Sequence, residues 1–137
     1  MTLTALRGDA LTTTEDGFAL RLGLPWIRSL PLASLEHLAL LVDGKPVETL
    51  SIQLAHRRID VGALAGERGW WFLQDRLVVR GAQRLRPGVH DVTVSFHLIV
   101  PYLHAGPDGP LTLPFQLDHP LTLDAPAPGR TVSRDVA

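Results

Sequence analysis

Cysteine is absent from this sequence of 137 residues, so disulfide bonds, thiolate metal sites and a cysteine nucleophile are excluded. No stretch approaches the roughly 18 uninterrupted apolar residues that a membrane-spanning helix needs, so we expect no membrane segment. The first nine residues, Met1 to Asp9, lack the basic start and the apolar run of a signal peptide. Together these absences predict a cytoplasmic chain.

Net charge is also small. Lysine and arginine together number 13, aspartate and glutamate together number 14, and the net charge is −1. A chain so close to neutrality has no general electrostatic attraction for nucleic acid or for an anionic membrane surface. We therefore expect neither as a partner.

The longest regular pattern lies between residues 85 and 102. From Val92 to Tyr102 every second residue is apolar, and the residues between them are mostly polar. This alternation predicts a strand with one buried face and one partly wet face. The Pro87-Gly88 pair ahead of it predicts a turn, because proline fixes one backbone dihedral and glycine permits a positive one.

Similar alternation predicts further strands along the chain. Residues 35–42 fit either a helix or a strand, and the Asp43-Gly44 hairpin signal that follows favours a strand. Pro114 cannot donate a hydrogen bond to a neighbouring strand, so its strand is expected at a sheet edge. The remaining expected strands are residues 3–7, 18–24, 50–54, 70–72, 77–79 and 111–117, the last of them extending through 121–123.

These patterns predict an all-β fold, a single-domain antiparallel β-sandwich of seven or eight short strands. At most one short helical turn is expected, near residues 60–65, where Asp60 could cap it. We assign residues 1–124 to the sandwich. Residues 125–137 have too little apolar surface to bury and are predicted to form a disordered tail.

The segment Trp26–Ser34 is a loop by its proline content, yet it is unusually apolar. Exposed apolar patches are uncommon on monomeric proteins. The loop therefore either folds back over one end of the core or docks on a partner, and the sequence leaves both interpretations open. Trp70 and Trp71 must point to opposite faces of their strand, so at most one of them lies in the core.

No catalytic set and no metal site are predicted. Six histidines include no His-x-His pair, and a site across strands would require His97, His104 and His119 to meet. Ser95 and His97 share a strand face, but Ser95 has no glycine elbow around it and fits an outward polar residue. As an alternative function, aromatic side chains could form a stacking platform for a sugar ring: Trp26, Trp70, Trp71 and Tyr102.

Several segments, in this order, resemble the small β subunit of bacterial C-glycoside deglycosidases. The similarity starts with Phe-Ala-Leu-Arg-Leu at residues 18–22 and Leu-Pro-Trp-Ile-Arg-Ser-Leu-Pro-Leu-Ala-Ser-Leu at 24–35. It continues through Leu-Val-Asp-Gly-Lys-Pro-Val at 41–47 and Leu-Arg-Pro-Gly-Val-His-Asp-Val-Thr-Val at 85–94. The resemblance spans residues 15 to 123.

The resemblance implies an accessory subunit of a carbon–carbon lyase. In this family the partner is a TIM-barrel α subunit that holds the divalent metal, Mn or Mg, and the acid and base groups. That complex cleaves the C–C bond of 3-oxo-C-glycosides, and no cofactor is expected in the β chain itself. The predicted interface with the α subunit is the apolar loop, with these residues: Trp26, Ile27, Arg28, Leu30, Pro31 and Leu32.

Overall fold

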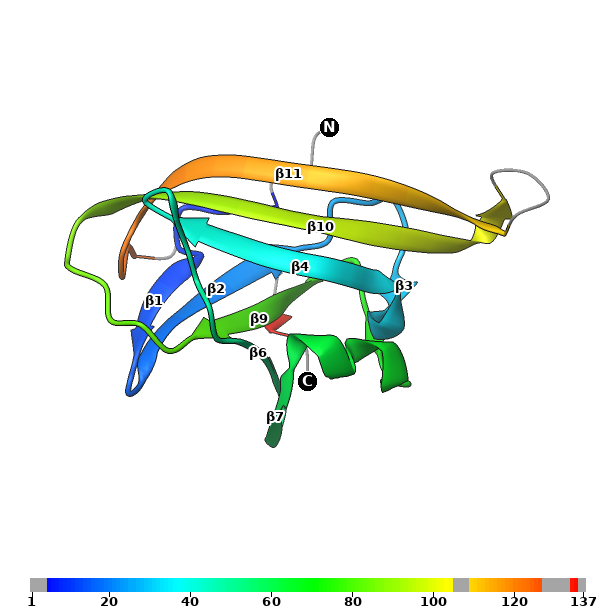
Figure 1. Ribbon diagram of the computed structural model, residues 1–137, viewed down its shortest axis with the longest axis horizontal. Helices are drawn as coiled ribbons and strands as arrows, with labels where there is room; N and C mark the ends of the chain where they lie inside the picture. The colour runs from blue at the N-terminus through cyan, green and yellow to red at the C-terminus, as the bar shows by residue number, and fades with distance from the viewer. Residues whose placement is uncertain (1–4, 105–108, 127–133, 136–137) are drawn as a thin grey trace.

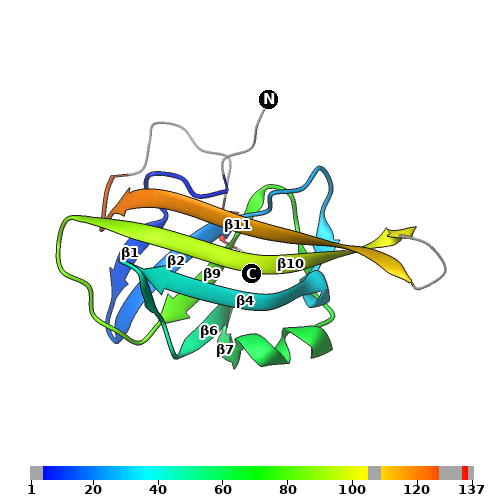
Figure 2. The same cartoon turned by 45° about the horizontal axis from the view of Figure 1, so that its top comes forward.

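A computed structural model of the chain describes residues 5–104, 109–126 and 134–135. Two β-sheets lie face to face (Figures 1 and 2). The apolar side chains between them form the core. No helix in these ranges is long and apolar enough to cross a membrane. The strands, in chain order, are β1 (Leu11–Thr14), β2 (Gly17–Gly23), β3 (Leu30–Pro31), β4 (Leu35–Val42), β5 (Lys45–Pro46), β6 (Leu50–Leu54), β7 (Arg57–Asp60), β8 (Trp70–Trp71), β9 (Asp75–Gly81), β10 (Val89–His104), β11 (Pro110–Thr122) and β12 (Arg134–Asp135).

The larger sheet has six strands, in the order β1-β2-β9-β6-β7, with β12 beside β9. The second sheet has four strands, in the order β11-β10-β4-β5, and β3 and β8 form a separate pair. Every pairing is antiparallel except that of β12 with β9. The predicted all-β class is confirmed.

The strands are more unequal in length than the sequence pattern suggested. Four of the twelve described strands have only two residues, which leaves eight longer ones. Two of these, β10 with 16 residues and β11 with 13, are long rather than short. They pair in register from Val89 opposite Thr122 to Val100 opposite Leu111.

Strand β10 follows the predicted alternation and organises the second sheet. Its side chains at even positions from Val92 to Val100 are buried, whereas those at the odd positions from Thr93 to Ile99 are partly exposed. The buried row packs against the inner row of β2, which includes Phe18. The apolar side chains of the two sheets therefore meet in one core.

Strand β4 confirms the choice of strand over helix for residues 35–42. The hairpin to β5 turns through Asp43, with φ 53°, and Gly44, with φ 79°. Positive φ at both central residues is the geometry of a type I′ turn, for which Asp-Gly is a preferred pair. The Asp43-Gly44 signal therefore gave the turn correctly.

Strand β11 lies at the edge of its sheet, as Pro114 predicted. Pro110, Pro114 and Pro120 all occupy even positions, so they share the side of the strand that faces away from β10. Proline has no N–H to offer an incoming strand, and its presence on an edge discourages edge-to-edge pairing.

Two short 3-10 turns interrupt the β structure within the described ranges. The turn at Val61–Gly66 lies where one was predicted, although the Asp60 side chain forms no capping hydrogen bond. A second turn, at Leu32–Ser34, follows β3 directly and was not expected.

The two ends of the chain differ in part from expectation. Residues 3 and 4 of the strand expected at residues 3–7 lie outside the described ranges, and Ala5 to Arg7 are not in a strand. The first strand is instead β1, whose run of threonines gave no alternating signal. Of the tail predicted to be disordered, 127–133 and 136–137 lie outside the described ranges, whereas Arg134 and Asp135 pair with β9.

Candidate functional site

The apolar loop after β2 folds across one end of the sandwich. There β3 and β8 pair, with Leu30 opposite Trp71 and Pro31 opposite Trp70. Leu30 is 1% exposed and Trp71 is fully buried, and the Trp71 indole donates to the carbonyl oxygen of Asp75 at 3.2 Å. One row of this strand pair therefore closes the core.

The other row faces outward. Alternation along the chain explains this, because a buried Trp71 forces its neighbours Trp70 and Phe72 toward solvent. Trp70 is 50% exposed, Phe72 53% and Ile27 74%. We call the following set the apolar end surface: Trp26, Ile27, Trp70, Phe72, Leu73, Tyr102 and Leu103.

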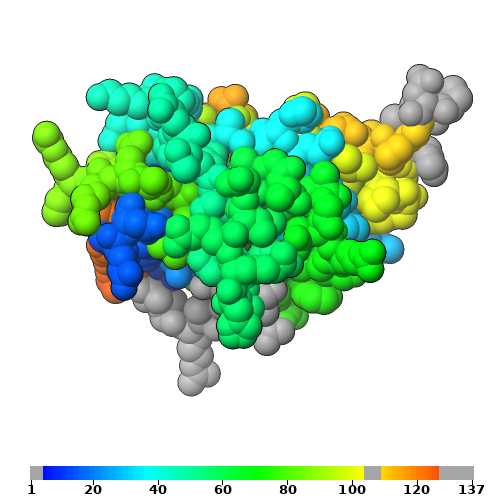
Figure 3. Space-filling view, turned by 60° about the horizontal axis from the view of Figure 1, so that its bottom comes forward, coloured from blue at the N-terminus to red at the C-terminus, as the bar shows by residue number. Residues whose placement is uncertain are grey.

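Three segments distant in sequence form this surface, and hydrogen bonds hold them together. The Trp26 indole donates to the Tyr102 hydroxyl at 2.6 Å, which joins the loop to the end of β10. The Leu73 backbone N–H donates to the Ser29 hydroxyl at 2.7 Å, which joins the loop to the segment after β8. In Figure 3 the yellow end of β10 and green segments lie side by side at the right of the molecule.

Two arginines flank the apolar end surface. The Arg28 guanidinium lies 5.5 Å from the centre of the Tyr102 ring, within range of a cation–π contact. Arg68 lies two residues before Trp70 and is exposed. Within the part of the chain that the structure describes, neither arginine forms an ion pair with a carboxylate.

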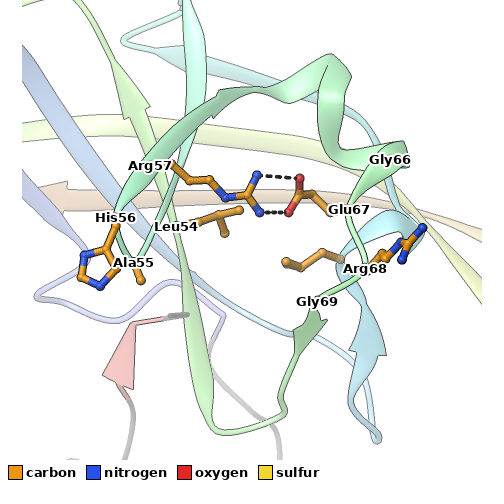
Figure 4. A pocket seen from close by; sticks show the side chains of 9 residues that line it. Leu54, Ala55, His56, Arg57, Gly66, Glu67, Arg68 and Gly69 are labelled. Atoms are coloured by element: carbon orange, nitrogen blue, oxygen red, sulfur yellow. Dashed lines mark hydrogen bonds and ion pairs between the residues drawn. The ribbon is translucent and has the colours of Figure 1, made fainter.

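A pocket of about 450 Å³ adjoins this end, between the β6–β7 turn and the segment after the Val61–Gly66 turn (Figure 4). Leu32 and Leu54 contribute its apolar lining. Arg57 and Glu67 face each other in it through two hydrogen bonds, and Glu67 holds the pKa of Arg57 above its ordinary value. The two charges of this pair therefore satisfy each other.

The described side chains among those considered for catalysis and metal binding form no common site. Within the described ranges, no group of three His, Asp or Glu side chains could hold a metal ion. His97 contacts the ring of His37, with ring centres 5.1 Å apart, and His119 bonds to the Pro120 carbonyl oxygen at 2.8 Å. The His104 side chain lies outside the described part of the structure.

The six residues predicted to contact a partner divide into two groups. Leu30 and Leu32 are 1% and 2% exposed and belong to the core, so their side chains are not free to contact another protein. Trp26 and Pro31 are partly exposed, and Ile27 and Arg28 are exposed. The loop therefore folds over the end of the core through Leu30 and Leu32, and docking through the exposed residues stays a prediction.

The aromatic platform considered for sugar binding is wrong in one member, because Trp71 is fully buried. Sequence reasoning also missed Phe72, Leu73, Leu103 and Arg68 as part of the exposed end. The period of two could have found Phe72, since it shares a face with Trp70 once Trp71 points inward. Leu103 gave no such signal, because only the tertiary fold brings the end of β10 to the loop.

The fold and its surface define a β-sandwich domain with an uncovered apolar end, a feature typical of proteins that associate with others. No family model matches the chain. It is 31% identical over 99 residues to a protein of Microbacterium sp. named 3'-dehydrocarminate deglycosidase beta subunit, covering 69% of this chain and 75% of that protein.

Two further relatives carry the name C-glycoside deglycosidase beta subunit. The chain is 33% identical over 98 residues to the protein of Arthrobacter globiformis, covering 68% of this chain and 75% of that protein. It is 32% identical over 97 residues to the protein of Microbacterium trichothecenolyticum, covering 68% and 74%. The chain therefore belongs to the family of C-glycoside deglycosidase beta subunits, as its sequence segments suggested.

Proposed function

We propose that this chain is the small, non-catalytic β subunit of a cytoplasmic C-glycoside deglycosidase. Its α subunit is a TIM barrel that holds a divalent metal, Mn or Mg, and the acid and base groups. The complex acts as a carbon–carbon lyase and separates a 3-oxo sugar from an aromatic aglycone by an elimination-type route. The metal belongs to the α subunit in this proposal.

The apolar end surface is the observation that carries the proposal. Three of its large apolar side chains are at least half exposed: Ile27 at 74%, Phe72 at 53% and Trp70 at 50%. Covering them with another protein removes apolar area from water, which is the main favourable term in protein association. Tryptophan and arginine are also the residue types most enriched at the energetic centres of interfaces.

Co-expression with the α subunit of the same organism tests the proposal. We expect the two chains to co-purify, and we expect aglycone release from a 3-oxo-C-glycoside with Mn²⁺ only when both are present. The isolated β chain with metal should give no product. Turnover by the β chain alone would contradict the non-catalytic role, and failure of the two chains to associate would contradict the subunit role.

A double substitution, Trp26→Ala with Arg28→Ala, tests the role of the loop. Loss of the complex, with no more than the small loss of stability expected from removing the Trp26–Tyr102 hydrogen bond, supports docking through the loop. A lower melting temperature with assembly intact would assign these residues to the fold alone.

The alternative function is a carbohydrate-binding module that acts by itself. Trp70 and Tyr102 favour it, since they are 50% and 44% exposed and aromatic rings stack on sugars. Aliphatic neighbours such as Ile27 and Leu103 weigh against it, because they offer sugar hydroxyls no hydrogen bond. Titration of the isolated chain with glucose and with a C-glycoside, followed by tryptophan fluorescence, distinguishes the two functions; saturable quenching would favour the module.

A further inference from the structure

We infer that the α subunit docks on the whole apolar end surface, and that its facing surface carries carboxylates opposite Arg28 and Arg68. This inference rests on the proposed function and extends it. The predicted loop is then only one of three contributors, together with the segment around β8 and the end of β10. The partner is defined by its chemistry: an apolar patch with an acidic rim.

The first argument is the continuity of the apolar side chains. Trp26 and Tyr102 are hydrogen-bonded to each other, and Leu73 is tied through its backbone to Ser29. The three segments are thus fixed before any partner arrives, and little conformational entropy remains to be lost on docking. Trp70 and Phe72 are the most exposed aromatic side chains of this surface, which makes them the expected anchors.

The second argument is electrostatic. A partner that covers this end also removes water from Arg28 and Arg68, and a desolvated guanidinium without acceptors is unfavourable. The nearby acid Glu67 is already bonded to Arg57, and Asp75 is 5% exposed and buried beneath the surface. The acceptors must therefore come from the partner, and carboxylates match the guanidinium fork best.

The same charges argue against a second copy of this chain as the occupant. A twofold dimer places the same surface patch of both copies in contact. Here that arrangement would gather four arginines, Arg28 and Arg68 of each copy, in one interface, and neither forms an ion pair with a carboxylate among the described residues. Like charges across an interface suppress such pairings. A different, acidic protein fits better.

The test measures binding of the purified α subunit to immobilised β chain. Trp70→Ala with Phe72→Ala should weaken the affinity at least about 30-fold, the size expected for hot-spot residues. Val89→Ala is the matched control, because Val89 is also an exposed apolar side chain, at 65%. Val89 is the first residue of β10, whereas Tyr102 lies near the opposite end of the same strand. Val89 and Tyr102 are 13 positions apart along β10, which corresponds to about 40 Å of strand. The control should bind as the unsubstituted chain does.

Salt dependence tests the acidic rim separately. Raising NaCl from about 0.05 M to 0.5 M should slow association of the unsubstituted chain, because salt screens charge pairs at an interface rim. The Arg28→Gln with Arg68→Gln variant should bind more weakly at low salt and lose most of this dependence. Thermal melting of each isolated variant should match the parent chain, since all four substituted side chains are surface residues.

The outcomes separate this inference from the proposed function. A complex that forms with the unsubstituted chain but tolerates both double variants overturns the inference and leaves the subunit role standing. If the double aromatic variant fails to bind while the Val89→Ala control binds, the composite surface is supported. Equal salt dependence with and without the two arginines would overturn the acidic rim. Absence of any complex would overturn the proposed function itself.

Discussion

The Trp26 indole donates a hydrogen bond to the Tyr102 hydroxyl at 2.6 Å, across a sequence separation of 76 residues. Tyr102 also carries the Arg28 guanidinium over its ring. One side chain at the end of β10 thus positions two residues of the loop between β2 and β3. The shape of the apolar end surface depends on this contact more than on any local preference of the loop.

Replacing Tyr102 with phenylalanine should lower the free energy of unfolding by about 0.5–1 kcal/mol. The effect is small because Trp26 is only partly buried, so water can replace the lost acceptor. Urea denaturation of both chains measures the difference. Tyr102→Ala should cost more, because it also removes the ring from the Arg28 side chain. Equal stability of all three chains would show that the contact contributes nothing.

Alanine substitutions of the neighbouring residues Trp70 and Trp71 should change the stability of the chain by very different amounts. Trp71 is fully buried, and its replacement should destabilise the chain by about 3–5 kcal/mol. Trp70 is 50% exposed and should change stability by no more than about 0.5 kcal/mol. Parallel denaturation curves check both values. Similar losses for the two variants would contradict the opposite orientation of these side chains.

Gly81 should not tolerate a side chain. A Cβ built there would lie 2.4 Å from the ring of Phe18, which is itself fully buried and cannot move aside. Gly81→Ala should therefore destabilise by about 1–3 kcal/mol through overpacking. Gly62→Ala is the control, since a Cβ at Gly62 meets no atom within 4 Å. Thermal melting of the two variants should separate them clearly, and equal melting temperatures would refute the close contact.

His90 should make stability depend on pH at the other end of the sandwich. Its Nε2 lies 2.6 Å from the Arg86 carbonyl oxygen and its Nδ1 lies 2.7 Å from Asp43. Both nitrogens face oxygen acceptors, an arrangement that favours the protonated ring, which donates from both nitrogens. The Arg86 carbonyl and then the Asp43 carboxylate raise the pKa of His90 above its ordinary value. In turn His90, followed by the Asp91 backbone N–H, lowers the pKa of Asp43.

The sign of the pH effect follows from these shifts. A raised His90 pKa stabilises the fold fully below about pH 6.5, and this contribution is lost as the pH rises through the folded-state pKa. A lowered Asp43 pKa stabilises the fold above about pH 4, and this contribution is lost as the pH falls through its folded-state pKa. The stability difference between the parent chain and His90→Gln should therefore be largest between these limits. Denaturation at pH 5, 7 and 9 measures it, and a constant difference would disprove the protonated ring.

Much of this fold could be read from local pattern. The alternation of β10, the Asp43-Gly44 turn and the edge position of β11 all depend on backbone properties of a few adjacent residues. The lengths of strands depend on what lies beside them. Strand β10 extends to 16 residues because β11 pairs along most of its length, which no local property encodes.

The candidate surface was only partly predictable for the same reason. The composition of residues 26–34 marked an apolar loop, but nothing local separated Leu30, which is buried, from Ile27, which is 74% exposed. Pairing of β3 with β8 made that separation, because it turned Leu30 and Trp71 inward together. A strand pair formed by segments 40 residues apart is a tertiary event.

The sequence by itself determined the all-β class, the main turns and the family, because each is written in short runs of residues whose chemistry acts locally. Only the tertiary structure decided which apolar side chains fill the core and which stay outside. The physical reason is that burial depends on neighbours brought together by folding: Tyr102 reaches Trp26, and Trp71 finds Leu30, only once the two sheets have closed.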